Sequence, residues 1–529
     1  MLQRIATRKF IIGLALITAP SVVSAQYFGR QKVQYEDFDW KVMPTTHFDV
    51  HFYPEEQTVT TDFARSAERW YSRLSRAFQH EFKKKPLIFY ADHPDFQQTN
   101  VIGGMLSEGT GGVTEGLRNR VIMPFTGVYR DNDHVLGHEL VHVFQYDLAS
   151  SPGGGGLAGM GRLPLWLVEG MAEYLSLGRD DPHTAMWLRD SALRGELPTI
   201  DQLTRDSRFF PYRYGQALWA YIGGRWGDRA VTELYRYATR AGWDAALQRV
   251  LGLNSANLSQ QWITSIRSTY LPVIQGRQRP RDAGQPILYD DEVGAMHLSP
   301  VVSPDGRFVA YFGRRELFTV DLYVADARTG EIVKRLTSPN RSEHFDALSF
   351  IQSAGTWSPD GRKFAFVVFA DGDNELAVLD VDSGDMERQI AVAGVGSLQN
   401  PAWSPDGSRI AFSGIKGGLS DLYILDVASG QVQQVTNDRY ADLQPTWSPD
   451  GRSIAFVTDR GPGTDFDRLI FGEMNIALFD VASRNVRVME FFQGEVKHVN
   501  PQFSPDGREL FFIADRDGFS DIYRTDLAS

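Results

Sequence analysis

Cysteine is absent from this chain of 529 residues. Its absence excludes disulfide bridges, thiolate metal ligands and a cysteine nucleophile, so a transition metal would have to be held by histidine and carboxylate side chains. Basic side chains are also fewer than acidic ones, 54 against 66, which gives a net charge of -12. This charge balance does not predict a surface for nucleic acid or for an anionic membrane, because both require a basic patch.

Apolar runs of membrane-spanning length are missing as well. Near the start, three basic residues between positions 4 and 9 precede an apolar run over residues 10–17, which is too short to cross a bilayer. Small residues follow at 23–25, as at a signal-peptidase site. Residues 1–25 are therefore predicted to be a secretory signal peptide, and the mature protein is predicted to be periplasmic or secreted, with no membrane span.

A tetrapeptide repeat dominates the second half of the chain. Ser-Pro-Asp-Gly recurs at intervals of about 45–55 residues, and each copy precedes an apolar segment typical of a strand. Proline fixes φ, while aspartate and glycine tolerate a tight corner, so each copy is predicted to form a turn. A second apolar strand follows each copy, which indicates the four-stranded blades of a β-propeller. The five copies begin at Ser303, Ser358, Ser404, Ser448 and Ser504.

These repeats resemble the WD-like blades of the periplasmic Tol-system propeller family. The resemblance implies an all-β propeller over residues 286–529, with five recognisable blades of which the last is incomplete. It also implies that this half binds or gates, with a possible envelope protein as its partner. Two possibilities remain open: either residues 287–289 close the ring, or the chain is shorter than a complete architecture.

Residues 26–275 have a different pattern, so the chain is predicted to be multidomain. Alternating or continuous apolar residues predict strands at 46–52, 86–90 and 120–124. Helical spacing predicts a helix over 61–82 and, further on, helices at 134–149, 165–177, 183–194, 214–226, 228–239 and 257–270. The prediction is an α+β domain, followed by a linker at 276–285 that contains proline and glycine.

One of these helices carries a metal-binding pattern. His138 and His142 are four residues apart, so both imidazoles project from one face of a helix and can share a Zn²⁺ ion. Glu139 follows the first histidine directly and is placed to act as a general base. The acidic and amide residues at 131–133 are predicted to cap the start of this helix.

A hydrolytic zinc site needs a third protein ligand and one open position. Glu169 stands in the largely apolar segment 165–177, and a helix so apolar is predicted to be buried. Glu169 is therefore predicted to complete a two-histidine, one-glutamate site with His138 and His142.

This pattern resembles the gluzincin peptidases, in particular the aminopeptidase and leukotriene-hydrolase branch. That branch has a His-Glu-x-x-His helix followed by Trp-Leu-x-Glu-Gly-x-Ala, which matches residues 166–172 here. The resemblance implies a zinc peptidase domain with His138, His142 and Glu169 as the metal ligands and Glu139 as the catalytic base.

The same resemblance assigns three further positions. The branch carries Pro-Tyr-x-x-Gly-x-Ala-Leu, whose tyrosine stabilises the oxyanion; here it matches Tyr212, with Tyr214 as the competing candidate. Glu173 matches an acidic residue that orients a zinc-bound histidine in thermolysin-like gluzincins. Residues 112–115 weakly resemble the strand motif of that branch whose glutamate anchors a peptide N-terminus, which makes Glu115 a candidate for this role. The preferred interpretation is a plain edge strand beside the cleft.

The sequence therefore predicts an exported, zinc-dependent metallopeptidase that acts on a peptide or protein substrate. The alternative is a non-catalytic envelope protein that binds through its propeller. A serine peptidase is not expected, because no Gly-x-Ser-x-Gly motif occurs. Neither the substrate nor the choice between endo- and exopeptidase follows from the sequence.

Overall fold

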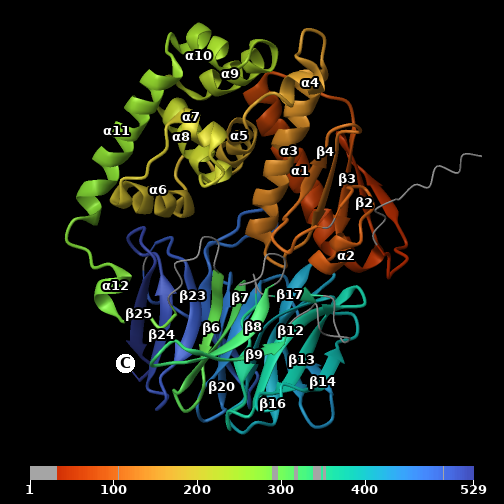
Figure 1. Ribbon diagram of the computed structural model, residues 1–529. Coiled ribbons are helices and arrows are strands. Elements are labelled where there is room, and N and C mark those ends of the chain that lie inside the picture. Colours follow the sequence, from red (N-terminus) through yellow and green to blue (C-terminus); the bar gives the residue numbers. More distant parts are fainter. Residues whose placement is uncertain are drawn as a thin grey trace, which may run out of the picture.

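A computed structural model of the chain describes residues 33–104, 106–288, 296–314, 320–337, 347–349, 353–492 and 494–528. The predicted signal peptide, residues 1–25, lies outside the described residues, as does residue 289 of the proposed ring-closing segment. An upper half built from a sheet and helices sits on a lower half built from strands, with one short helix beside its last strand (Figure 1).

The upper half contains one five-stranded sheet in the order β1-β2-β3-β5-β4. Its three central strands run parallel, and the edge strands β1 and β4 are antiparallel to their neighbours. Alternation in β2 buries Phe48, Val50 and Phe52 on one face. The strands are β1 (Lys41–Pro44), β2 (Phe48–Phe52), β3 (Lys85–Tyr90), β4 (Val113–Glu115) and β5 (Arg120–Pro124).

Helices fill the rest of the upper half. The two longest, α1 (Gln57–Phe78) and α3 (Tyr129–Ser150), pack together, and Phe78 stacks on Phe144 with a 5.5 Å ring separation. Short helices η1 (Pro54–Glu56) and α2 (His93–Gln97) lie between the strands. The others are α4 (Gly156–Met160), α5 (Leu165–Leu177), α6 (Pro182–Arg194), α7 (Ile200–Arg205), α8 (Pro211–Trp226), α9 (Asp228–Ala241), α10 (Trp243–Leu251), α11 (Ser255–Ile274) and α12 (Pro280–Ala283). The last lies inside the predicted linker.

The predicted cap of α3 at residues 131–133 is wrong. The helix begins at Tyr129, its N-cap residue is Val128, and no side chain caps it. Asn132 instead accepts a 2.9 Å hydrogen bond from the backbone N–H of Thr126, so it fixes the turn before the helix. Asp133 accepts a 3.1 Å hydrogen bond from the indole of Trp70 on α1. Because the helix already begins at Tyr129, residues 131–133 lie inside its first turn and cannot be the N-cap.

The lower half is a propeller of five sheets, which confirms the predicted blades and the multidomain architecture. Four sheets have four or more strands, and the last has three among the described residues. The strands are β6 (Met296–Val302), β7 (Phe308–Arg314), β8 (Asp321–Asp326) and β9 (Ile332–Thr337); β10 (Ala347–Leu348), β11 (Thr356–Trp357), β12 (Lys363–Ala370), β13 (Asp373–Asp380) and β14 (Met386–Ala391); β15 (Ser397–Trp403), β16 (Arg409–Lys416), β17 (Leu419–Asp426) and β18 (Val432–Gln434); β19 (Asp442–Trp447), β20 (Ser453–Thr458), β21 (Asn475–Asp480) and β22 (Val486–Met489); β23 (His498–Phe503), β24 (Glu509–Ala514) and β25 (Asp521–Asp526).

Each Ser-Pro-Asp-Gly repeat forms the same turn between the first two strands of its blade. In all five copies the serine hydroxyl lies 2.6 Å from Oδ1 of the aspartate. The glycine takes a φ of +70° to +73°, a left-handed conformation that costs other residues more than glycine. The repeat therefore marks the turn at which the chain reverses direction between two neighbouring strands of each blade.

The fourth blade reaches up to the helical half. An insertion between β20 and β21, residues 461–473, lies against α1 and the start of α3. Phe466 and Phe471 pack on Tyr129 with ring separations of 4.8 and 5.5 Å. Arg69 of α1 donates to the carbonyl of Leu469 at 2.6 Å. The insertion thus holds the helix that carries the histidine pair.

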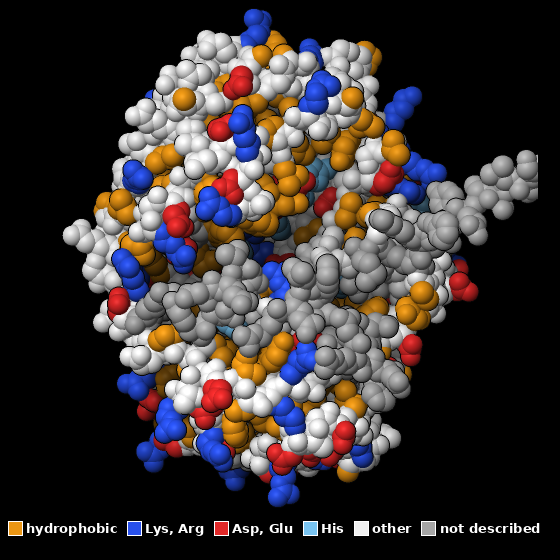
Figure 2. All heavy atoms as spheres, viewed as in Figure 1, with side chains coloured by type: hydrophobic (Ala, Val, Ile, Leu, Met, Phe, Trp, Pro, Cys, Tyr) orange, Lys and Arg blue, Asp and Glu red, His pale blue; other side chains and the backbone are white. Residues whose placement is uncertain are grey.

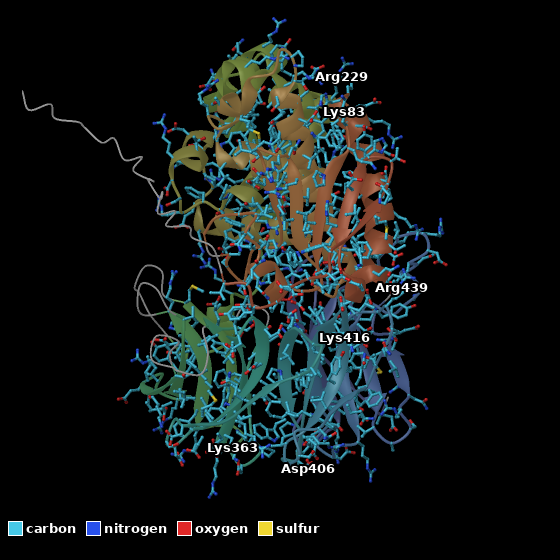
Figure 3. The ribbon with its side chains drawn as sticks, turned by 90° about the vertical axis from the view of Figure 1, so that its right-hand side faces the viewer. Lys83, Arg229, Lys363, Asp406, Lys416 and Arg439 are labelled. Carbon is cyan, nitrogen blue, oxygen red and sulfur yellow. The ribbon has the colours of Figure 1, made fainter. Side chains whose placement is uncertain are left out.

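Two ion pairs also join the propeller to the helical half in this region. Arg130 of α3 pairs with Glu473 at the end of the insertion. Arg439, which Figure 3 shows where the two halves meet, pairs with Asp62 of α1, and the Asp62 carboxylate also accepts a hydrogen bond from Tyr129 at 2.9 Å. The propeller and the helical half are therefore joined by apolar, polar and charged contacts at one place.

In the described part of the chain, every helix is too short or too polar to cross a membrane.

Candidate metal centre

Two helices that cross closely bring the predicted site residues together. Gly170 of α5 and Gly215 of α8 are in backbone contact, and a Cβ on Gly215 would lie 2.8 Å from Cα of Gly170. Glu169 precedes the first glycine, and Tyr212 lies one helical turn before the second. The glycines of both sequence motifs are thus explained by helix packing, which places Glu169 and Tyr212 on the same side of the crossing.

The three predicted metal ligands converge on one point. Nε2 of His138 lies 3.1 Å from Nε2 of His142. Oε2 of Glu169 lies 3.3 Å from the first nitrogen and 3.1 Å from the second. Ligands held tetrahedrally at zinc bond lengths are about 3.3–3.6 Å apart. The donor set and its spacing therefore fit a zinc ion after adjustments of a few tenths of an ångström.

Each histidine is oriented through its other ring nitrogen. Oε1 of Glu173 lies 3.0 Å from Nδ1 of His138, and its second oxygen accepts a 3.0 Å contact from Arg213. Nδ1 of His142 lies 2.8 Å from Oε1 of Gln145, whose amide donates to the carbonyl of Val168 at 3.1 Å. These partners hold both imidazoles with Nε2 toward the common point. Groups bonded to the second ring nitrogen generally orient metal-bound histidines in this way.

The electrostatics of the site favour a cation. Burial alone would lower the pKa of His138, but the carboxylates of Glu169 and Glu173 outweigh it and raise that pKa to about 10. The same competition raises the pKa of His142, with Glu169 as the main opposing group. The two histidines in turn hold the pKa of Glu169 far below its usual range despite burial. A positive charge at the common point is therefore stabilised by its surroundings.

Glu139 lies beside the ligands and is fixed by strand β4. Its Oε2 accepts a 2.6 Å hydrogen bond from the hydroxyl of Thr114, which also contacts the Glu139 backbone carbonyl at 3.0 Å. Gly112, just before the strand, approaches so closely that a Cβ there would lie 3.2 Å from Oε1 of Glu139. One carboxylate oxygen is thus anchored, and the cleft runs directly past the other.

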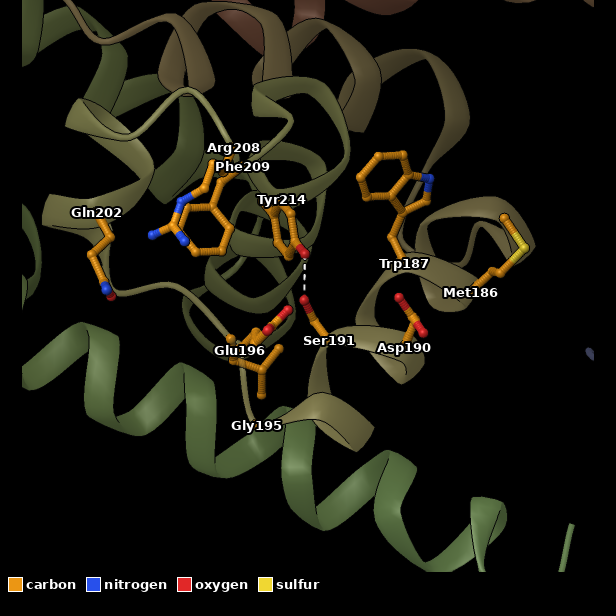
Figure 4. A pocket seen from close by; sticks show the side chains of 11 residues that line it. Met186, Trp187, Asp190, Ser191, Gly195, Glu196, Gln202, Arg208, Phe209 and Tyr214 are labelled. Carbon is orange, nitrogen blue, oxygen red and sulfur yellow. Dashed lines mark hydrogen bonds between the residues drawn. The ribbon is translucent and has the colours of Figure 1, made fainter. Parts of the chain in front are cut away.

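Tyr212 lines the same cleft, whereas Tyr214 does not. The ring of Tyr212 stacks on His138 at 6.0 Å, and burial together with the Glu169 carboxylate raises the pKa of its phenol. Tyr214 is buried elsewhere, 2.5 Å from the hydroxyl of Ser191 in a second pocket between α6, α7 and α8 (Figure 4). Of the two candidates, Tyr212 is the one placed to donate a hydrogen bond in the cleft.

Glu115 plays a local role in the hairpin that follows β4. Its carboxylate accepts from the backbone N–H groups of Leu117 and Arg118 at 2.9 and 3.1 Å, and it lies 3.2 Å from Arg120. These contacts satisfy both of its oxygens. The interpretation of this segment as an edge strand beside the cleft agrees with the sheet order, in which β4 is terminal.

The cleft itself has a volume of about 620 Å³. Figure 2 shows a hollow in the upper half in which histidine side chains are visible. Its lining combines the glycine-rich approach to β4, the histidine face of α3 and the aromatic start of α8, with Thr114, His134, Val135, Tyr146, Phe210 and Tyr212 among the residues. The space is large enough for several residues of a peptide.

Three residues of this centre were not predicted from the sequence. Gln145 lies three positions after His142 on the same helix, so helical spacing could have identified it. Arg213 and Thr114 reach the site from other elements, and no local pattern marks them. Each acts through a predicted residue: Gln145 through His142, Arg213 through Glu173, and Thr114 through Glu139.

Comparison with known proteins identifies the propeller. The family described as the TolB beta propeller domain matches residues 349–466. No curated protein matches the chain. Solved structures that resemble it include TolB from Acinetobacter baumannii, at 23% identity and a TM-score of 0.37, over 46% of this chain and 55% of that one. The chain thus spans little more than half of that relative.

Two further solved structures are similar over comparable shares of the chain. A candidate TolB from Agrobacterium tumefaciens is 24% identical over 43% of this chain and 74% of that one, with a TM-score of 0.32. A manganese complex of oligogalacturonate lyase is 18% identical over 44% and 64%, with a TM-score of 0.33. The five sheets form a β-propeller in the C-terminal half of the chain, and residues 349–466 of this propeller match the TolB beta propeller domain family.

Proposed function

We propose that this chain is an exported zinc metallopeptidase of the gluzincin type, with the propeller serving substrate or partner binding. The observation that carries the proposal is the convergence of three donor atoms, from His138, His142 and Glu169, at mutual distances of 3.1–3.3 Å. A zinc ion held there would act as a Lewis acid that polarises the scissile carbonyl and acidifies a water molecule.

The remaining residues of the cleft supply proton transfer and charge stabilisation. Glu139 is adjacent to the ligand set and takes the proton of the attacking water, then delivers it to the leaving amine. Thr114 holds this carboxylate in place through its 2.6 Å hydrogen bond. Tyr212 keeps its proton because its pKa is raised, and it donates a hydrogen bond to the oxyanion as charge develops there.

The edge of the sheet gives a way to bind an extended peptide. β4 pairs with β5 on one side, and no described strand pairs with its other side. Residues 111–114 of this edge line the cleft beside Glu139. A substrate backbone added along β4 would gain main-chain hydrogen bonds independent of its sequence, and its peptide bond would pass the ligand set.

Zinc content and peptide hydrolysis, measured together, test the proposal. The purified full-length chain is expected to contain one zinc ion and to cleave members of an unbiased peptide library. Glu139→Gln should retain the zinc and lower the rate by about 10²–10⁴-fold, the usual contribution of a general base. Glu233→Gln, which alters an exposed carboxylate paired with Arg229, is the matched control and should behave as wild type.

If no zinc binds to the protein, or if Glu139→Gln changes none of the measured activity, the chain is not a metallopeptidase of this kind.

A second function is supported by a different observation. The matched TolB propeller family favours an envelope protein that binds a partner through its propeller, with the upper half as a scaffold. In that case a pull-down from envelope extract should recover the same partner with wild type and with Glu139→Gln, and neither should digest the peptide library.

A further inference from the structure

A row of aromatic rings leads from the metal centre toward helix α6. Tyr212 stacks on His138, and Phe210 in turn stacks on Tyr212, with ring centres 5.2 Å apart and an interplanar angle of 24°. Trp187 of α6 continues the row, 5.5 Å from Phe210 at an angle of 31°. Side chains from α3, from α6 and from the start of α8 therefore form one aromatic surface that begins at a proposed metal ligand.

Phe210 is the part of this row that is most open to the cleft. It lines the cleft together with Tyr212 and the three proposed ligands, and 41% of it is exposed. Phe210 is the N-cap residue of α8 and Pro211 follows it, which restricts its backbone to extended conformations. The ring is thus held by its backbone and its aromatic neighbours, and its apolar surface stays accessible.

A second pocket, of about 650 Å³, lies next to Phe210 between α6, α7 and α8 (Figure 4). Trp187 lines this pocket and contacts Tyr214 within it at 6.2 Å. Phe209 packs on Tyr214 at 5.7 Å, and Figure 4 shows Phe209 and Trp187 on either side of that ring. Met186, which is 43% exposed, adds an adaptable apolar side chain. Because Trp187 belongs to both the row and the pocket, the apolar surface continues from the cleft into the pocket.

The exposure of Phe210 sets it apart from the packing aromatics of the neighbouring helices. Trp166 of α5 and Trp219 of α8 are fully buried and pack together at 6.3 Å. Phe210 instead leaves a large, rigid apolar surface in contact with water, and binding of an apolar group removes that contact. Aromatic rings placed in this way are typical anchors of binding sites.

The charges around the second pocket disfavour an acidic ligand. Asp190 is paired with Arg194 at 3.1 Å, and Arg208 is paired with Asp206 at 2.6 Å. Glu196 also lines the pocket, and in the described part of the chain it forms no ion pair. One carboxylate is therefore in excess, and it would repel an acidic side chain bound beside it.

We propose that Phe210 and Trp187 form a specificity subsite that takes a bulky apolar side chain of the peptide substrate and excludes an acidic one. This inference rests on the proposed peptidase function and names the substrate class of the same cleft. Two ring contacts, of 6.0 and 5.2 Å, separate Phe210 from His138. Because an extended chain rises about 3.3 Å per residue, the side chain that meets Phe210 belongs to a residue within about three positions of the scissile bond.

Peptide binding to the full-length Glu139→Gln chain tests this subsite without relying on catalysis. The protein, with one equivalent of zinc, is titrated against three fluorescein-labelled nonapeptides of alanine and serine that differ only in a central Phe, Ala or Glu. Fluorescence anisotropy gives each Kd. The Phe peptide is expected to bind at least about tenfold more tightly than the Ala peptide, and the Glu peptide more weakly than either.

The same titrations are repeated with substitutions added to Glu139→Gln. Phe210→Ala should reduce the advantage of the Phe peptide to less than about threefold, and Trp187→Ala should reduce it in the same direction. Phe210→Leu keeps an apolar side chain and should retain most of the preference. Leu271→Ala is the matched control, because it truncates a side chain of α11 that is equally exposed, at 41%, and lines neither pocket. It should keep the full preference.

Cleavage of these peptides by the wild-type chain separates the subsite from the peptidase function. If no peptide is cleaved but the binding preference is present, the peptidase function is wrong and the subsite stands. The subsite is overturned if the three peptides bind equally or show no saturable binding, or if Phe210→Ala has the same preference as Leu271→Ala.

Discussion

Gly170 and Gly215 touch through their backbones, so the helix that carries Glu169 and the helix that carries Tyr212 cross with no side chain between them. We expect Gly170→Ala to force these helices apart and to cost about 1–3 kcal/mol of stability, as overpacking in a core does. Zinc affinity should fall with it, because Glu169 moves away from the histidine pair. Thermal unfolding and zinc titration measure both effects.

Gly224→Ala, on α8 as well, is the matched control for that change. A Cβ at Gly224 meets nothing within 4 Å, so alanine there should stabilise the helix by about 0.5–1 kcal/mol. Equal effects of the two substitutions would contradict the close-crossing explanation.

Thr114→Val removes the hydroxyl that holds Glu139 and keeps the volume of the side chain. Loss of one hydrogen bond to a charged acceptor is expected to lower kcat about 10–100-fold. Zinc content should not change, because Thr114 contacts none of the ligands in the described structure. Thr114→Ser retains the donor and should recover most of the rate; a valine variant as active as the serine variant would argue against this role.

Gln145→Leu should weaken zinc binding about 10–100-fold, since it removes the group that orients His142. The measurement is competition with a zinc chelator at a fixed pH. Gln248→Leu makes the same chemical change at an exposed site on α10 and should leave zinc affinity intact. A loss of stability without a loss of zinc affinity would show that Gln145 acts only in packing.

The joint replacement of Phe466 and Phe471 by alanine should loosen the contact between the propeller and α3. Both rings pack on Tyr129, nine residues before His138. We expect the two halves to unfold at separate temperatures and zinc affinity to decrease. Ile470→Ala lies in the same insertion but alters a side chain that is 44% exposed, so it should change neither quantity.

Asp95 of α2, a buried carboxylate close to the second blade, predicts a specific dependence of stability on pH. The folded-state pKa of Asp95 is about 7, above its unfolded value of about 3.9. The folded state therefore holds more protons between these values, and its stability falls as pH rises from about 4 toward 8. The groups that face Asp95 are Tyr53, Glu36, Glu55, Glu56, Asp92 and Asp373.

The sequence was most informative where spacing within one element decides geometry. The four-residue interval between His138 and His142 puts both rings on one face of α3, and the repeated turns mark the blades. The helix predicted at 134–149 begins five residues too late, because α3 begins at Tyr129 after Val128 and no capping side chain marks that start. Residues that reach the centre from other elements, such as Arg213, have no periodic signal at all.

The contact between α2 and the second blade was beyond prediction for the same reason. Glu36, Asp92 and Asp373 are far apart in the chain, and single acidic residues in turns are indistinguishable from ordinary solvated ones. Only the packing of the second blade against α2 brings them together. The insertion at 461–473 interrupts the repeat, but nothing in its composition indicates that it packs against α3.

That insertion links residues that are 400 and 402 positions apart, Arg69 with Leu469 and Arg65 with Asp467. The two halves therefore cannot be exchanged between proteins as independent modules. In related chains, a change in the length of this insertion should be accompanied by changes at positions 65, 69 and 129. An evolutionary signal confined to the three proposed metal ligands would miss this dependence between the insertion of the fourth blade and the helix that it contacts.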